Sequence, residues 1–423
     1  METAVSRSGA RFPALHHKNF ALLWSGLIVS NIGTWMQNVG TGWLILQLTD
    51  SPLWLGLLGL SFALPMMTLP LVGGAVVDRV HRIRLLYFTQ TGAMLVAFAL
   101  AALTWLHLVN VWHLLTASFL VAVLLAFDNP ARQALIPDLV PGSDLLNALS
   151  LNAATYNGAA LLGPALAGVM LGPLGAAALF FLNGVSYVAV LFALFAMRNV
   201  RTHSGSRHAS LAEAMTTGFA YAWRNRLILA LLLLSALAAI FGRSYQNLLP
   251  IFARDIWHGG PEGYGLLLSA AGGGALVGAF GLAFIRQVHR QGLVLVVSGL
   301  LFSATLIAFA VSPGLGAGLV LLFISGISST VFGTIITTFI QVATPNELRG
   351  RVMSLYAITL IGLPSLGALV SGASAEWLGG IQGAPRAVLI AAALLGMVLV
   401  AVSPFFWNRR MSVHPRGEGV SEK

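Results

Sequence analysis

The strongest constraint on the fold of this chain is a succession of apolar runs, each long enough to cross a lipid bilayer. A transmembrane helix needs about 20 mostly apolar residues. Only 9% of the 423 residues are charged, whereas a soluble domain carries about 25%. The composition therefore cannot supply a water-facing surface, and the runs are interpreted as membrane spans. The sequence predicts an all-α polytopic membrane protein.

Breaks in hydropathy divide the chain into twelve candidate transmembrane helices. They cover residues 21–47, 53–77, 85–107, 112–136, 145–170, 174–197, 227–252, 263–286, 292–311, 315–341, 352–375 and 386–407. The first run follows a polar segment and is longer than the core of a cleavable signal peptide. We therefore expect it to remain in the protein as the first span.

The distribution of basic residues predicts the orientation in the membrane. With the amino terminus in the cytoplasm, 20 of the 23 Lys and Arg residues fall on the cytoplasmic side. Only Arg254 and Arg386 fall outside, and Arg243 lies within a span. This is the bias described by the positive-inside rule, and it predicts cytoplasmic termini and an even number of spans. The bases form no cluster interleaved with aromatic residues, so no nucleic-acid partner is expected.

The two halves of the chain resemble each other. Gly73, Gln133 and Pro137 recur 208 positions later, and Pro52 recurs 209 positions later. The segment Val-His-Arg at residues 80–82 also recurs after 208 positions. We expect two parallel six-helix pseudo-repeats, residues 1–198 and 227–423. Parallel repeats with a site between them are a recurrent plan of transporters.

A polar linker, residues 199–226, separates the predicted halves. Ser210 and Glu213 have the spacing of a helix capping box. Apolar residues then recur every fourth position, namely Leu211, Met215, Phe219 and Trp223. The pattern predicts a short amphipathic helix on the cytoplasmic membrane surface. A linker helix without membrane contact is the alternative.

Five stretches carry a resemblance to a known family, the first of which is GGAVVDRVHRIR at residues 73–84. Gly74, Asp78, Arg79 and Arg82 fit the loop motif G-x-x-x-D-R/K-x-G-R/K-R/K of the major facilitator superfamily, with His81 at a glycine position. The second stretch, residues 127–152, is typical of the exporter branch that includes enterobactin exporters and macrolide efflux proteins. The residues NLLPIFARDIW and PNELRGRVMSLY resemble the same branch. The resemblance covers essentially the whole chain.

The remaining stretch, AALLGPALAG at residues 159–168, resembles the antiporter motif of that superfamily. Gly163, Pro164 and Gly168 match it, and Ala159 and Ala167 replace glycines. The alternative interpretation is a closely packed membrane helix bent at its proline.

The resemblance implies an exporter that works by alternating access, with a cavity lined by helices 1, 4, 7 and 10. Three of these helices carry aligned polar residues, and helix 5 adds two more. The candidates for the cavity are Asn31, Trp35, Gln37, Asn38, Tyr156, Asn157, Arg243, Gln246, Asn247, Thr334 and Gln341. The alternative for any one of them is a hydrogen bond that only joins two helices.

Two charged residues fall inside predicted spans. A central Arg or Asp costs about 2.5–3.5 kcal/mol to insert and usually has a partner or a function. We interpret Asp128 as a carboxylate that couples transport to protons, against the alternative of a static ion pair with Arg132, one turn away. We interpret Arg243 as a ligand for an anionic substrate or a partner of Asp128. The alternative for Arg243 is snorkelling or capping of the backbone near Pro250.

The resemblance assigns a switching function to the loop motif. Asp78 is expected to close the cytoplasmic side by pairing with Arg79 or Arg82. Asp78 is also expected to meet the start of helix 11 near Arg351, where the helix dipole favours an anion.

Other functions are left open or disfavoured. The leading prediction is proton-coupled efflux of amphipathic small molecules, such as drugs or siderophores, from a bacterial inner membrane. Lipid or lysophospholipid flipping and metabolite uptake are alternatives. A membrane enzyme is disfavoured because no catalytic constellation stands out. The chain has no cysteine, which excludes thiolate metal sites, and no metal or cofactor is expected. We expect a monomer whose partners are the substrate, protons and membrane lipids.

Overall fold

The computed structural model describes residues 12–69, 79–198, 219–285 and 290–407. All regular structure in these ranges is helical, which confirms the predicted fold class. The longer helices are α1 (Lys18–Thr49), α2 (Pro52–Thr68), α4 (Arg82–Trp105), α5 (Val111–Leu139), α6 (Leu145–Ala196), α8 (Arg226–Leu237), α9 (Tyr245–Ile251), α10 (Gly260–Phe284), α11 (Gln291–Ala310), α12 (Leu315–Ala343), α13 (Asn346–Ile361), α14 (Leu363–Trp377) and α15 (Ala384–Phe406).

The 52-residue helix α6 contains two spans, because the chain turns within it. Gly175 adopts a φ of 74° two residues after Pro173, a backbone conformation that glycine reaches without a steric penalty. The turn lies next to the break predicted between residues 170 and 174. With α6 counted twice and the interrupted helices 226–256 and 346–377 counted once each, the described ranges hold the twelve helices that the sequence predicts.

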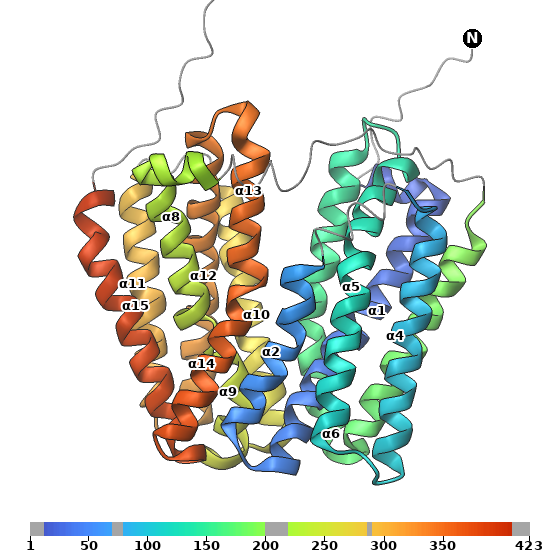
Figure 1. Cartoon of the computed structure of the whole chain (residues 1–423), viewed down its shortest axis with the longest axis horizontal. Helices are drawn as coiled ribbons and strands as arrows, with labels where there is room; N and C mark the ends of the chain where they lie inside the picture. The colour runs from blue at the N-terminus through green and yellow to red at the C-terminus, as the bar shows by residue number, and fades with distance from the viewer. Residues whose placement is uncertain (1–11, 70–78, 199–218, 286–289, 408–423) are drawn as a thin grey trace, which may run out of the picture. The chain divides into compact units, whose positions relative to one another are not determined.

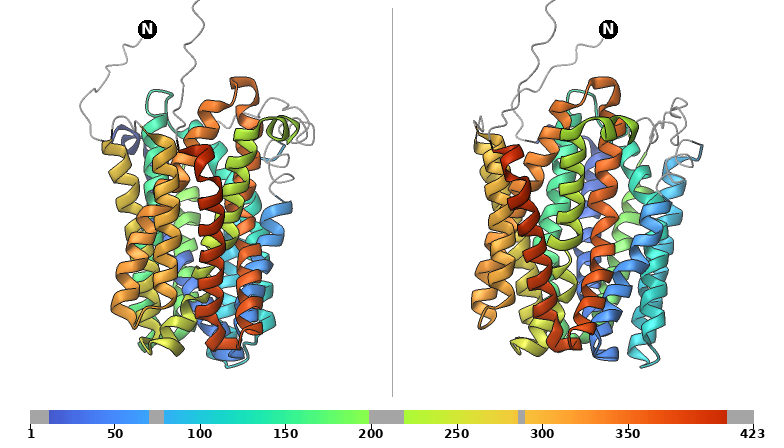
Figure 2. Two further views of the ribbon diagram at one scale, coloured as in Figure 1. Left: turned by 90° about the vertical axis from the view of Figure 1, so that its left-hand side faces the viewer. Right: turned by 60° about the vertical axis from the view of Figure 1, so that its left-hand side comes forward.

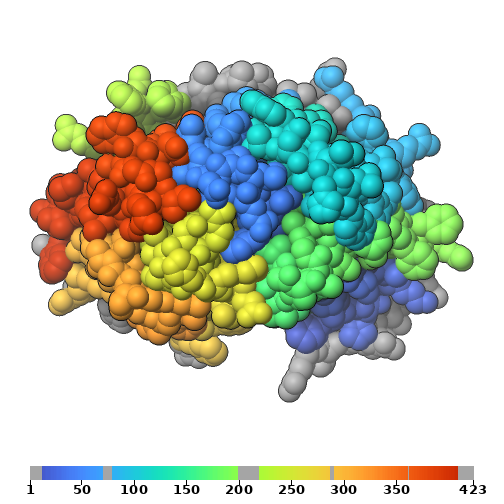
Figure 3. Space-filling view, turned by 90° about the horizontal axis from the view of Figure 1, so that it is seen from below, coloured from blue at the N-terminus to red at the C-terminus, as the bar shows by residue number. Residues whose placement is uncertain are grey.

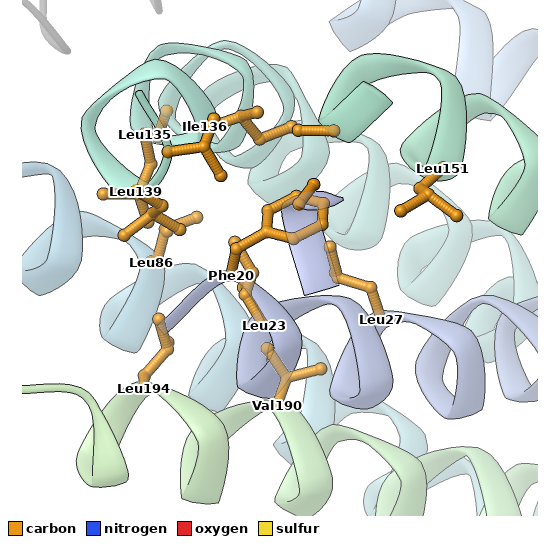
Figure 4. Close-up of a cluster of buried hydrophobic side chains, with 14 residues drawn as sticks. Phe20, Leu23, Leu27, Leu86, Leu135, Ile136, Leu139, Leu151, Val190 and Leu194 are labelled. Atoms are coloured by element: carbon orange, nitrogen blue, oxygen red, sulfur yellow. The ribbon is translucent and has the colours of Figure 1, made fainter. Parts of the chain in front are cut away.

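The first of two compact units contains residues 1–49, 61–207 and 260–265. Within it α1 packs along α6, and α4 packs against α5 and α6 (Figure 1). Figure 4 shows apolar side chains of all four helices meeting at one end of the unit, among them Phe20, Leu86, Leu135 and Val190. This cluster holds together the ends of α1, α4, α5 and α6 that lie at this side of the unit.

The second compact unit contains residues 50–60, 208–259 and 266–423. Its helix α11 packs against α12 and α15, as Figure 2 shows. Helix α14 packs against α15 and against the segment Ala238–Gly242. Gly367 of α14 makes that approach close, since an added Cβ would collide with the backbone carbonyl of Ile240.

Each unit includes a short segment whose neighbours along the chain belong to the other unit. These segments are residues 50–60 in the second unit and residues 260–265 in the first. The start of α2 packs on α14 in the second unit, where a Cβ added to Gly372 would lie 2.6 Å from the carbonyl oxygen of Pro52. Figure 3 shows the beginning of α2 beside the end of α14. The start of α10 packs on α6 in the first unit, where a Cβ added to Gly265 would lie 2.5 Å from the carbonyl oxygen of Pro164. Side chains at either glycine would push the backbones apart.

The helix at 226–256 is interrupted by π-helical turns that the sequence did not predict. The segments η2 (Ala238–Gly242) and η3 (Phe252–Ile256) are π-helical and flank α9. Such turns are rare in proteins, and those that occur are often found at functional sites. Arg243 lies at the end of η2, directly before α9.

Candidate functional site

Asp128 lies deep inside the first unit. It is 2% exposed, and α5 continues for eleven residues beyond it, to Leu139. At 1.5 Å per residue, the carboxylate lies about 16 Å from that end of the helix. The sequence placed Asp128 inside a predicted span, and the structure buries it there.

Three neighbours hold the carboxylate of Asp128. Thr89 and Gln90 of α4 both donate hydrogen bonds of 2.8 Å to its Oδ1. Nη2 of Arg132 lies 3.2 Å from its Oδ2, and the same nitrogen donates to Oδ1 of Asn129 at 2.6 Å. Hydrogen bonds to an ionised acceptor are stronger than those between neutral groups. The arrangement therefore stabilises a buried anion.

A second polar layer lies beside this cluster, on α1 and the second half of α6. The Tyr187 hydroxyl is 3.4 Å from Oγ1 of Thr34 and lies within electrostatic reach of Asp128. Asn183 donates a hydrogen bond of 2.7 Å to Oε1 of Gln37. We expected Gln37 on a cavity-lining face, but it is buried between the two helices. The structure corrects its position, because the rotation of α1 turns it toward Asn183.

The loop motif is only partly described. Gly74 and Asp78 lie outside the described residues, so the predicted contacts of Asp78 stay predictions. Arg79 is exposed. Nη1 of Arg82 bonds Oδ2 of Asp138 at 2.5 Å.

The pairing of Arg82 joins the start of α4 to the end of α5. Its Nη1 also donates to the carbonyl of Ala134 at 3.0 Å, and the side chains of Arg82 and Asp138 are only 10% and 9% exposed. Arg351, the predicted neighbour of Asp78, is partly buried in α13.

An aromatic and polar face runs along α1 and the first half of α6. Trp35 and Tyr156 meet edge to face, with ring centroids 6.3 Å apart. Gly163 makes room for Trp35, since an added Cβ would lie 2.5 Å from the Trp35 Cβ. Tyr156 is 58% exposed. The face also includes Asn31, which is partly buried, and Asn38 and Asn157, which are exposed.

The rest of the predicted helix-bend motif serves close packing. Pro164 lies inside α6 without ending the helix. A Cβ added to Gly168 would lie 3.0 Å from Cα of Gly265 in the second turn of α10. Small residues at a helix contact allow such an approach. The motif thus builds a tight contact between α6 and α10.

In the second unit, Arg243 presents its guanidinium group at the break between η2 and α9. The residue is exposed, and the described residues provide no carboxylate partner for it. It lies 17 residues from Arg226 and 13 from Ile256. Those distances correspond to about 26 Å and 20 Å of helix. Both ends of the helix lie further away than a snorkelling side chain reaches, and the alternative of backbone capping near Pro250 stays a prediction.

Other polar candidates accompany Arg243 in the second unit. Gln246 is exposed and Asn247 is partly buried on α9, while Thr334 and Gln341 are exposed on α12. Thr337 turns inward instead and donates a hydrogen bond of 2.8 Å to the Tyr356 hydroxyl of α13. The described residues contain no cluster of three or more His, Asp or Glu side chains that could hold a metal ion.

Sequence reasoning missed four residues that complete these clusters: Thr89, Gln90, Asp138 and Tyr187. Thr89 and Gln90 are adjacent polar residues in the middle of an apolar run, and polar residues at that depth are rare enough to signal a partner. Asp138 is part of the stretch 127–152, but its helix-end position concealed its burial. No sequence signal marks Tyr187.

Comparisons with known proteins agree on a class of transporters. The model of a family described as transmembrane secretion effectors matches residues 9–412. The staphyloferrin A transporter of Staphylococcus aureus is 23% identical, over 90% of this chain and 94% of its own length. The multidrug efflux pump Tap of Mycolicibacterium fortuitum is 24% identical, also over 90% and 94%. The macrolide efflux protein A of Streptococcus pyogenes is 24% identical, over 85% and 90%.

Solved structures show the same fold at lower identity. The nucleoside transporter NupG matches with a TM-score of 0.74 and 13% identity, over 93% of this chain and 100% of its own. A bacterial homologue of the human lysosomal transporter Spinster matches with a TM-score of 0.71 and 15% identity, over 94% and 98%.

Proposed function

From the premise that this chain belongs to the transmembrane secretion effector family of the major facilitator superfamily, we propose that it exports amphipathic small molecules in exchange for protons. The observation that carries the proposal is Asp128, a carboxylate 2% exposed and about 16 Å from the end of its helix. A carboxyl group whose environment alternates between buried and hydrated can load and release a proton. The pair with Arg132 holds the anion in one step of the cycle.

Reconstitution tests the coupling directly. Purified protein in liposomes is offered a panel of dyes, antibiotics and siderophores under an imposed pH gradient. We expect gradient-dependent movement with the unaltered protein and loss of that dependence in Asp128→Asn. The matched control is Asp144→Asn, which removes a partly exposed carboxylate at the start of α6.

Two outcomes would contradict this assignment. Transport by Asp128→Asn that still follows the pH gradient would remove Asp128 from coupling. Lipid movement without movement of any panel compound would favour the flippase alternative. The same liposomes separate export from uptake, because the direction of the gradient is imposed.

We further propose that the aromatic face of the first unit and the polar face around Arg243 contact the substrate. Trp35 and Tyr156 provide adaptable apolar surface, and a few polar groups orient the ligand, as in other small-molecule sites. The proposed polar contacts are Asn31, Asn38, Asn157, Arg243, Gln246, Asn247, Thr334 and Gln341. The guanidinium of Arg243, which has no carboxylate partner among the described residues, favours a substrate with an anionic group.

The proposed orientation has both termini in the cytoplasm of a bacterium. The chain lacks cysteine, so a single introduced cysteine can be labelled without background. Ser143→Cys, between α5 and α6, should react with a membrane-impermeant reagent only from the cytoplasmic side. Leu108→Cys, between α4 and α5, should react only from the outside. The reverse pattern would overturn the orientation.

A further inference from the structure

Two buried oxygen atoms around Asp128 accept no hydrogen bond from any residue that the structure describes. They are Oε1 of Gln90 and Oδ2 of Asp128, on residues 5% and 2% exposed. Among the described residues, only the 3.2 Å ion pair with Arg132 reaches Oδ2. A buried acceptor without a donor destabilises the folded protein. Both atoms therefore mark a position where a further hydrogen atom would be stabilised.

The chemistry of the two groups fixes their orientation. An ionised carboxylate only accepts hydrogen bonds, so the amide nitrogen of Gln90 is the atom that faces Oδ1 of Asp128. That bond is formed at 2.8 Å. A primary amide and a neutral carboxylic acid can form two hydrogen bonds, N–H to one carboxyl oxygen and O–H to the amide oxygen. The first is present here, and the two unpaired oxygens are the atoms that the second would join.

Building on the proton-coupled export proposed above, we propose that Asp128 takes up its proton on Oδ2 and that Oε1 of Gln90 accepts the resulting hydrogen bond. A proton from water forms a new O–H bond at Oδ2, and no group is oxidised or reduced. The ion pair between Oδ2 and Arg132 opens. Arg132 keeps an acceptor, because its Nη2 already donates to Oδ1 of Asn129 at 2.6 Å.

Gln90 is then a positioning residue that serves both protonation states. In the anionic state it donates to Oδ1, and in the neutral state it both donates and accepts. The other groups that face the carboxyl are Thr89 on α4, Arg132 on α5 and the Tyr187 phenol on α6, to which Thr34 of α1 is hydrogen-bonded. Of these, only Arg132 carries a charge that opposes protonation.

Infrared difference spectroscopy on the reconstituted full chain tests the assignment. The carboxylic acid band of Asp128 is identified by its loss in Asp128→Asn, and its growth is followed as the pH falls. Thr89→Val removes a donor to the anion alone, so the proton should bind about tenfold more tightly. Gln90→Met removes a donor to the anion and also the acceptor for the proton, so the affinity should change by no more than about twofold. The band should also move to higher frequency in Gln90→Met.

The outcomes separate this inference from the proposed function. If Gln90→Met tightens proton binding as much as Thr89→Val does, Gln90 is only a donor and the inference is overturned. An Asp128 band whose frequency does not change in Gln90→Met would overturn it as well. If no Asp128 band appears while transport still follows the pH gradient in Asp128→Asn, the coupling role of Asp128 fails with it. If Asp128→Asn loses coupling but Gln90 acts only as a donor, the inference about Gln90 is overturned and the coupling role of Asp128 stands.

Discussion

The two compact units differ in whether their charged side chains have partners of opposite charge. In the first unit the buried charges of the described residues have partners: Asp128 pairs with Arg132 at 3.2 Å inside α5, and Arg82 pairs with Asp138 at 2.5 Å where α4 begins and α5 ends. In the second unit Arg243 sits at a π-helical break, exposed, with no carboxylate partner among the described residues. The repeat seen in the sequence therefore does not extend to the chemistry of the two units.

The difference suggests a division of work between the units. A paired charge can be switched by a proton, because protonation of the acid releases the base. A guanidinium without a carboxylate partner costs free energy to place inside the membrane. Binding of an anion would offset that cost. We therefore infer that the first unit carries the coupling and the second carries the charge recognition of the substrate.

The largest expected effect is the loss of one partner of the Arg82–Asp138 pair. Arg82→Met removes the guanidinium that pairs with Asp138, whose side chain is 9% exposed. Breaking a buried pair from one side destabilises a protein by about 3–5 kcal/mol, which would appear in unfolding of the purified protein in detergent. The control is the double variant Arg82→Met with Asp138→Leu, which should recover most of the loss. Equal losses in the single and double variants would contradict a buried pair.

The Asp128 cluster should discriminate between two replacements of similar size. Asp128→Asn offers an amide N–H to Oε1 of Gln90, whereas Asp128→Leu leaves the polar groups of Thr89 and Gln90 unpaired. We expect Asp128→Leu to be less stable than Asp128→Asn by about 1–3 kcal/mol. Both variants leave Arg132 without its carboxylate, so that cost cancels in the comparison. Equal melting temperatures would show that the hydrogen bonds around Asp128 do not contribute.

Arg243 should behave differently from every charge in the first unit. Arg243→Gln removes no contact to a carboxylate, so stability should be unchanged or higher. Transport of anionic compounds should fall by about tenfold, the effect of roughly 1.4 kcal/mol in substrate binding. Transport of neutral compounds should persist, and Arg243→Lys should retain part of the anion transport. A variant that loses stability but not anion transport would place Arg243 in the packing of the bundle.

The arrangement of helices was largely predictable, because the hydrocarbon core imposes one length on every span. The predicted break between the spans 145–170 and 174–197 lies next to the observed turn at Gly175. It could be predicted because a proline and several glycines interrupt the apolar run there. The π-helical turns around α9 were not predictable. One of them ends at Gly242, which packs so closely on Phe302 that an added Cβ would lie 2.5 Å from the ring, and such a long-range contact leaves no local sequence signal.

The direction in which a polar residue points was the least predictable feature. Gln37 and Asn38 are neighbours in sequence, yet one is buried against Asn183 and the other is exposed. A rotation of α1 by one residue would exchange them, and hydropathy does not determine that rotation. The pairing of Asp128 with Arg132 was predictable, because residues four apart share a helix face. The pairing of Arg82 with Asp138 was not, since 56 residues separate the two.

The smallest expected effect concerns a hydrogen-bonded His–Asp pair of the first unit that is close to water. His17 lies 2.8 Å from Asp144, and the two side chains are 32% and 21% exposed. Water screens such a pair, and exposed pairs contribute about 0–1 kcal/mol. His17→Gln should therefore lower stability by less than about 1 kcal/mol and leave gradient-driven transport unchanged. The control is Asn19→Ala, which removes a neutral hydrogen bond to the carbonyl of Arg198 at 2.9 Å. If His17→Gln were as damaging as Arg82→Met, burial would not be what distinguishes the ion pairs of this unit.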